Sequence, residues 1–228
     1  MTIKEQTLLS LYEDMVEWRR HLHKHPELSF HEHNTSRMIA GLLESWGLEV
    51  RRGAAGTGVI AKITGGLPGR TIALRADIDA LPIQEDKESS YKSTVAGVMH
   101  ACGHDGHTAQ LLAVARYYSL HRNDTEGTRI FLFQPAEELL PGGAVGMIAD
   151  GALEGVDVIY GVHLWSPMPY GVVAARAGTF MAAPDEYEIE IIGRGGHGGT
   201  ASMQGRAGRR SVACRGAADD RFPQRGPA

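Results

Sequence analysis

The segment HACGHDGHTAQ, residues 100–110, gathers histidines, one cysteine and one aspartate within a few positions. Cys102 and His104 stand two positions apart, so an extended loop could aim both side chains at one centre. A cysteine thiolate and an imidazole together suit a borderline divalent ion such as zinc, manganese, cobalt or nickel. The alternatives are redox chemistry at Cys102, which the absence of a CxxC motif disfavours, and a polar helix start.

Two adjacent carboxylates follow the apolar run RIFLFQPA. Glu137 and Glu138 would repel each other unless a cation lay nearby, and neighbouring side chains diverge once the chain leaves a strand. One carboxylate can then ligate a metal while the other takes a proton from a water molecule that attacks an amide. Taken alone, such a pair is typical of surface charge, so its interpretation depends on the other candidates.

Further candidates follow two other predicted strands. Asp77 and Asp79 come after TIALRA, and His163 comes after VDVIYGV. Ligands of α/β proteins bind beyond the carboxyl ends of the strands, so we expect these side chains at one edge of one sheet. The alternatives are that Asp79 only shapes the turn before Pro82 and that His163 is a core histidine. We expect His107 to support a ligand or cap the helix.

The spacing of apolar residues predicts the elements that position these side chains. Helices are expected over 5–24, from a cap at Asn34 or Thr35 to Gly47, from Gly103 to about His121, and over 142–153. Strands are expected over 58–63, 71–77, 128–134 and 156–165, the first two joined by a hairpin-like turn over 64–70. This alternation predicts an α/β domain with a largely parallel, mixed sheet flanked by helices. An alternating, half-exposed strand over 185–196 follows a domain boundary near Pro184.

Composition narrows the class of protein. The chain has 228 residues, is 43% hydrophobic and carries a net charge of −4, which is typical of a globular protein that binds neither nucleic acid nor an anionic membrane. No membrane span or secretory leader is evident, so we expect a cytoplasmic protein. The histidine-rich segment over 21–33 is not favoured as the main metal site, because Pro26 interrupts it and Glu27 and Leu28 suggest a turn between helices.

The motifs carry a family resemblance when they are taken together. WRRHLHKHPELSFHEHNT, LRADIDALPI, MHACGHDGHTAQLL, FLFQPAEE, GVHLW and GRGGHGG resemble the metal-dependent amidohydrolases. That family includes hippurate hydrolase, N-acyl-amino-acid amidohydrolases and indole-acetyl-amino-acid hydrolases, within the aminoacylase and carboxypeptidase superfamily. The resemblance covers residues 15 to about 199 in order. It implies a zinc-exopeptidase-like catalytic domain, followed by the first strand of a smaller α+β lid and dimerisation domain.

The resemblance implies a centre of two divalent metal ions, with manganese, zinc, nickel and cobalt all open. Cys102 matches the ligand that both ions share. His104, Glu138 and His163 each match a ligand of one ion.

The resemblance also implies roles in the reaction. Glu137 matches the general base, and Asp77 matches the carboxylate that orients a ligand. His197, in GGHGG, matches the lid histidine that helps bind substrate and stabilise the oxyanion. The implied substrates are small N-acyl amino acids such as hippurate, cut to a carboxylic acid and an amino acid.

The chain departs from the family pattern after Gly199. Residues 200–228 contain six arginines, two aspartates and no lysine, whereas the family continues its lid domain and later supplies another metal-binding histidine. We therefore expect residues 1–183 to be the N-terminal part of the catalytic domain and 184–199 the start of the lid. We expect 200–228 to be a disordered basic tail produced by a reading-frame shift. A genuine basic tail that binds an acidic partner is the alternative.

These departures bear on activity. A C-terminally truncated chain is expected to be inactive or impaired, and a homo-oligomer through the lid is expected only in the full-length form. A non-catalytic metal-binding or regulatory remnant is the alternative function. A thiol oxidoreductase is disfavoured because no resolving cysteine accompanies Cys102.

Overall fold

The computed structural model describes residues 3–179, 181, 186–191 and 212–217. The chain divides into two units, Met1–Met168 and Pro169–Ala228. The division falls before the boundary expected near Pro184, because the chain after Trp165 forms no helix or strand over the described residues up to 179. Among the described residues, no helix is long and apolar enough to cross a membrane.

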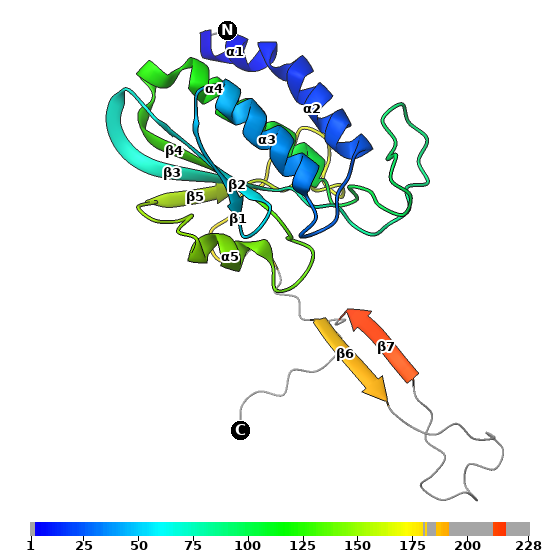
Figure 1. The fold of residues 1–228 in the computed structure, drawn as a ribbon. Coiled ribbons are helices and arrows are strands. Elements are labelled where there is room, and N and C mark those ends of the chain that lie inside the picture. Colours follow the sequence, from blue (N-terminus) through cyan, green and yellow to red (C-terminus); the bar gives the residue numbers. More distant parts are fainter. Residues whose placement is uncertain (1–2, 180, 182–185, 192–211, 218–228) are drawn as a thin grey trace, which may run out of the picture. The chain divides into compact units, whose positions relative to one another are not determined.

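The first unit is built on a five-stranded sheet in the order β1-β2-β4-β3-β5 (Figure 1). The strands are β1 (Glu49–Ala54), β2 (Gly58–Thr64), β3 (Leu67–Asp77), β4 (Glu126–Gln134) and β5 (Val158–Gly161). β3 pairs in parallel with both β4 and β5, whereas β2 is antiparallel to β1 and β4. The mixed α/β sheet predicted from the sequence is confirmed.

Helices cover both faces of this sheet (Figure 1). The helices α1 (Ile3–Ser10), α2 (Tyr12–Lys24), α3 (His33–Ser45) and α4 (His104–Leu120) lie on one side, and α5 (Gly143–Ala149) lies on the other. A short 3-10 helix, Arg122–Asp124, connects α4 to β4. The helix predicted over 5–24 is two helices that meet at the buried Leu11.

The central strand β4 explains why the sequence reads there as an unbroken apolar run. Phe131 and Phe133 pack into the core beneath α3 and α4, while Ile130 and Leu132 join a second core that includes Met147 of α5. A strand covered on both faces has no solvent side and needs no polar alternation.

The hairpin predicted between β2 and β3 is wrong, because β4 lies between these strands. The backbone N–H of Gly65 donates to the carbonyl of Gly127 at 2.8 Å, and that of Gly66 donates to the carbonyl of Arg122 at 2.9 Å. A Cβ at Gly65 would collide with the carbonyl oxygen of Thr125. These glycines therefore permit a close crossing beside β4, and they do not form the expected tight turn.

The start of α3 also differs from the expectation. Asn34 and Thr35 lie inside the helix and do not cap it. Their backbone N–H groups donate to the Glu27 carboxylate at 2.9 and 2.8 Å. A carboxylate from the preceding turn thus satisfies the free amides of the first helical turn, a task that a cap residue would otherwise perform.

The second unit contains a two-stranded antiparallel sheet of β6 (Glu186–Ile191) and β7 (Val212–Ala217). β7 falls within the segment expected to be a basic tail, and that expectation stays a prediction. His197, Pro184 and the remainder of 200–228 lie outside the described residues.

Candidate metal centre

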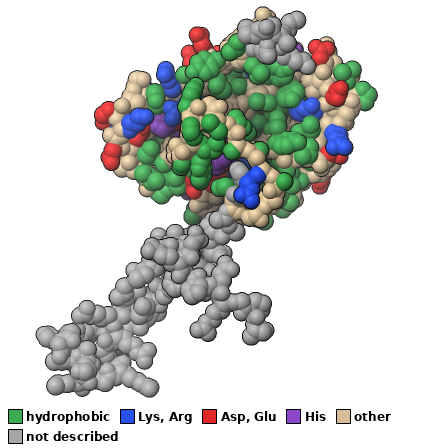
Figure 2. Space-filling model, turned by 180° about the vertical axis from the view of Figure 1, so that it is seen from behind, with side chains coloured by type: hydrophobic (Ala, Val, Ile, Leu, Met, Phe, Trp, Pro, Cys, Tyr) green, Lys and Arg blue, Asp and Glu red, His purple; other side chains and the backbone are tan. Residues whose placement is uncertain are grey.

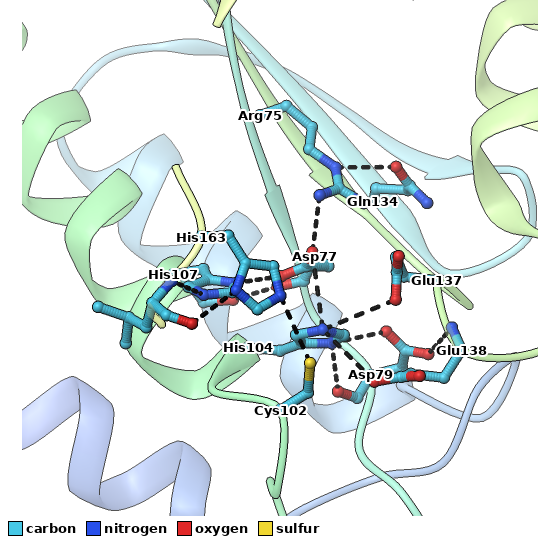
Figure 3. A network of polar contacts seen from close by, with 12 residues as sticks. Arg75, Asp77, Asp79, Cys102, His104, His107, Gln134, Glu137, Glu138 and His163 are labelled. Atoms are coloured by element: carbon cyan, nitrogen blue, oxygen red, sulfur yellow. Dashed lines mark hydrogen bonds and ion pairs between the residues drawn. The ribbon is translucent and has the colours of Figure 1, made fainter. Parts of the chain in front are cut away.

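The candidate site lies at the carboxyl edge of the three parallel strands (Figure 3). β3 ends at Asp77, β4 ends at Gln134, and β5 ends at Gly161. The chain that continues from each strand, together with the segment that begins α4, supplies the side chains of the site. Six of the predicted site residues meet here: Cys102, His104, Asp77, Glu137, Glu138 and His163.

His104 lies at the centre of this cluster and is 1% exposed. Its Nδ1 lies 3.0 Å from the carbonyl oxygen of Asp79 and 3.1 Å from the Asp79 carboxylate, so Nδ1 carries a proton and donates it. Its Nε2 is buried and has no hydrogen-bond partner. Burial lowers the pKa of His104, but the Asp79 hydrogen bond and the nearby carboxylates outweigh burial and raise it.

Three carboxylates face this unpartnered Nε2 of His104. Asp77 and Glu138 each approach to 3.7 Å and Glu137 to 3.8 Å. So much negative charge around a buried nitrogen calls for a positive charge among them. A divalent cation would provide it and would use Nε2 as a ligand.

Cys102 and His163 meet on another side of His104. The Sγ of Cys102 lies 3.4 Å from Nε2 of His163, and Nδ1 of His163 donates to the carbonyl of Leu164 at 2.6 Å. The free electron pair of Nε2 therefore faces the thiol. Burial, together with the charge of Glu138 and Glu137, raises the pKa of the Cys102 thiol to about 12. Without a cation beside it, this thiol is a poor nucleophile, which disfavours thiol redox chemistry.

The adjacent glutamates are not equivalent. The backbone N–H of Glu138 donates to the Asp79 carboxylate at 3.0 Å, which anchors that residue against the His104 side of the site. Burial and the charge of Glu138 raise the pKa of Glu137. A raised pKa brings a carboxylate closer to the range in which it exchanges protons near neutral pH.

Asp77 forms a second buried network. It accepts hydrogen bonds from Nδ1 of His107 at 2.6 Å and from Arg75 at 2.7 Å, and Arg75 also donates to Gln134 at 2.9 Å. Burial would raise the pKa of Asp77, but His107 and Arg75 outweigh it and lower the pKa to about 2. With this low pKa, Asp77 is ionised at neutral pH.

The contacts divide the expected orienting role between two aspartates. Asp79 contacts Nδ1 of His104, the position expected of a carboxylate that orients a ligand, whereas Asp77 contacts Nδ1 of His107. Nε2 of His107 accepts the backbone N–H of Leu164 at 2.8 Å, so both of its nitrogens are engaged. His107 is thus a supporting residue. The sequence offered one signal for Asp79: it stands two positions after Asp77 and so can point to the same side.

The available donors match those of a borderline divalent ion. Ligand atoms of Cys102, His104 and His163 lie within 4.8 Å of one another, and so do those of His104, Glu137 and Glu138. His104 belongs to both groups. A third group, with Asp77 and His107, is less suitable because His107 has no free nitrogen. No candidate group in the described part of the chain includes a histidine from 21–33.

His23 of the histidine-rich segment instead belongs to a buried charged network. His23 contacts Asp105 at 2.7 Å and Glu85 at 3.2 Å, and Arg19 contacts Asp105 at 2.9 Å. Asp105 is in the first turn of α4, where a negative charge complements the helix dipole. This network joins α2 to the start of α4.

Comparisons with known proteins agree with this geometry. The sequence profile described as peptidase family M20/M25/M40 matches residues 73–215. An N-acyl-L-amino acid amidohydrolase of Geobacillus stearothermophilus is 53% identical over 186 residues, which cover 81% of this chain and 50% of the relative. The IAA-amino acid hydrolase ILR1-like 2 of Arabidopsis thaliana is 48% identical over 187 residues, covering 82% of this chain and 42% of the relative.

A solved structure of an M20-family protein is also similar to this chain. The Bacillus subtilis YXEP protein, described as a dinuclear metal-binding peptidase of the M20 family, superposes with a TM-score of 0.74 at 43% identity. The superposition covers 81% of this chain and 52% of that protein. The chain thus spans about half the length of the relatives it matches.

Proposed function

Because this chain belongs to peptidase family M20/M25/M40, we propose that its site binds divalent metal ions and serves the hydrolysis of N-acyl amino acids. The observation that carries the proposal is the buried, unpartnered Nε2 of His104, which three carboxylates face. Relatives named for N-acyl and indole-acetyl amino acids support an amide substrate of this class, with hippurate as one candidate.

The proposed metal ligands are those that the family resemblance implies, and each of them has a donor atom within 4.8 Å of one of His104. Cys102 would be shared between two ions, while His104, Glu138 and His163 would each hold one. Asp79 fixes the ring of His104, and the carbonyl of Leu164 fixes that of His163. Bound divalent ions would polarise the amide carbonyl and lower the pKa of a water molecule.

Glu137 is the proposed general base. Its pKa is raised by burial and by the neighbouring charge of Glu138, and its side chain is 40% exposed, so water can reach it. It would accept a proton from the attacking water and return that proton to the departing nitrogen. Asp77 would act indirectly by holding His107, which in turn holds the backbone of Leu164 beside His163. His197, outside the described residues, is proposed to bind the substrate and the oxyanion.

The family resemblance implies one more metal-binding histidine beyond the matched stretch, and residues 1–228 taken alone would hold one ion with fewer ligands. We therefore expect this 228-residue chain to bind metal but to hydrolyse amides slowly or not at all. A non-catalytic metal-binding role is the second candidate. A cytoplasmic location and oligomer formation through the lid remain predictions.

Metal content and hydrolysis of hippurate and N-acetyl amino acids test the proposal. The purified chain should bind manganese, zinc, cobalt or nickel. Glu138→Gln should lose metal, and Glu137→Gln should keep metal and lose hydrolysis. Glu126→Gln, at an exposed position of β4, is the matched control and should change neither. A wild-type chain that binds none of these ions contradicts the proposal. Slow hydrolysis that Glu137→Gln abolishes supports the hydrolytic role, whereas residual hydrolysis that Glu137→Gln leaves unchanged favours the non-catalytic role.

A further inference from the structure

Glu32 is a fully buried carboxylate outside the cluster of candidate ligands. It lies immediately before α3 and is 0% exposed. One carboxylate oxygen accepts the backbone N–H of Ala136 at 2.8 Å, and the other accepts the hydroxyl of Thr57 at 2.6 Å. A buried carboxylate is costly, and apolar residues often stabilise a core at least as well. Its place in this fold therefore points to a more specific role.

Ala136 is the point at which the chain turns into the site. Its φ of +46° is in the left-handed region, which residues with a side chain rarely adopt. Ala136 is itself buried, and its carbonyl accepts the N–H of Gly143 at 3.0 Å. Such a conformation persists only where surrounding contacts hold it. Those contacts are the bond to Glu32 on one side of Ala136 and the bond to Gly143 on the other.

The two residues after this turn are the adjacent glutamates. Glu137 and Glu138 come 3.8 and 3.7 Å from Nε2 of His104, and their position depends on the direction in which the chain leaves Ala136. The preceding residue, Pro135, has no N–H with which to anchor the segment. Pro135 packs against the start of β2, since a Cβ at Gly58 would lie 2.8 Å from its ring.

We propose that Glu32 is a positioning residue whose buried carboxylate holds the N–H of Ala136 and thereby sets Glu137 and Glu138 against His104. It acts through the backbone and forms no hydrogen bond or ion pair with any of the proposed ligands. Only the expected effect of Glu32 on metal binding rests on the proposed function. The link from Glu32 to the turn is a feature of the fold by itself.

Substitutions separate this role from a general contribution to stability. Glu32→Ala removes both hydrogen bonds. Glu32→Gln keeps an oxygen for Ala136 and offers an amide N–H to the Thr57 hydroxyl, which can accept it, so this variant should restore the turn. Thr57→Val is the matched control, because it removes one bond to Glu32 and leaves the Ala136 bond in place.

Two measurements are made on the full chain. The first is hydrogen exchange at the Glu138 amide without metal, because that N–H donates to Asp79. The second is titration with Co²⁺ alone, followed by the charge-transfer absorption of a cobalt–thiolate bond at Cys102. Glu32→Ala should speed exchange by about tenfold or more and weaken Co²⁺ binding about 10–100-fold. Glu32→Gln and Thr57→Val should stay near the wild type in both.

Each result decides the inference. An unchanged rate of hydrogen exchange at the Glu138 amide in Glu32→Ala overturns the inference. An equally large increase of that rate in Thr57→Val overturns it too, because it would indicate only lost stability. The expected exchange pattern supports it even if the wild type fails to bind Co²⁺, in which case the proposed metal function alone fails. If Glu32→Ala does not fold, Glu32→Asp replaces it, because the shorter side chain cannot reach both partners.

Discussion

Asp79 contacts His104 twice, through its carbonyl oxygen at 3.0 Å and its carboxylate at 3.1 Å from Nδ1. The same carboxylate accepts the hydroxyl of Ser29 at 2.7 Å and the N–H of Glu138 at 3.0 Å. Asp79 thus fixes the tautomer of His104 and places Glu138 on the same side of the site. A carboxylate behind a histidine raises the basicity of the other ring nitrogen and fixes its direction.

Replacement of Asp79 should therefore weaken metal binding without removing a ligand. We expect Asp79→Ala to lower the affinity for Zn²⁺ or Co²⁺ about 10–100-fold, as measured by calorimetric titration. Asp124→Ala, at an exposed position of the 3-10 helix, is the control and should leave the affinity unchanged. Equal affinities for Asp79→Ala and the wild type would show that His104 needs no support from Asp79.

The thiol of Cys102 should be unreactive in the absence of metal. Its pKa of about 12, raised by burial and the charge of Glu138, leaves almost no thiolate at pH 8. In a Cys214→Ser background, iodoacetamide should alkylate Cys102 at least about tenfold more slowly than it alkylates glutathione. Metal binding should release protons, which a weakly buffered titration detects. Rapid alkylation of the metal-free chain would favour the thiol redox alternative.

The general position of the site was predictable because it depends on a rule about strand direction. Asp77, Glu137 and His163 follow strands whose carboxyl ends meet at one edge, and the apolar runs before them were visible in the sequence. Residue type and spacing made Cys102 and His104 candidates, and their proposed role as ligands came from the family resemblance. These signals are local, so they can be recognised without knowledge of the strand order.

Contacts between distant segments were not predictable in the same way. The insertion of β4 between β2 and β3 depends on backbone bonds from Gly65 and Gly66, which resemble turn residues in the sequence. Glu27 satisfies the first turn of α3 although Asn34 and Thr35 are better caps by residue type. In each case a hydrogen bond between distant segments took the place of the tight turn or helix cap that the sequence predicted.

The edge strand β5 should promote self-association. In the described part of the sheet it pairs only with β3, and its Ile159 and Tyr160 are 46% and 57% exposed. Hydrophobic side chains also cover much of the middle of the face in Figure 2. Exposed apolar edge strands are common sites of aggregation, and a lysine on the edge opposes it.

Light scattering as a function of concentration tests this expectation. At high concentration, the Tyr160→Lys variant should have a lower mean mass than the wild-type chain. Tyr12→Lys introduces the same change on α2 at a residue that is 59% exposed, and it should have no such effect. A wild-type chain that remains monomeric at every concentration would contradict the prediction.

His23 should make stability depend on pH in the neutral to mildly alkaline range. The hydrogen bond to Asp105 raises the pKa of His23, and together with Glu85 it outweighs the lowering effect of burial. The folded pKa thus lies above that of the unfolded chain, near 6.5. The stabilisation by protonated His23 is complete below about pH 6.5 and is lost as the pH rises through the folded value.

Urea unfolding between pH 6 and 9 in the presence of a chelator measures this effect. His23→Gln should lower the free energy of unfolding at pH 6 by about 1–3 kcal/mol, because it removes one of the two charged partners, His23 and Arg19, that contact the buried carboxylate of Asp105. The difference from the wild type should shrink as the pH rises. His104 changes stability in the same direction, but it is present in both proteins and cancels in the comparison. His31→Gln, at an exposed position, should follow the wild-type curve. A constant difference between His23→Gln and the wild type across this range would mean that His23 contributes by packing and not by its charge.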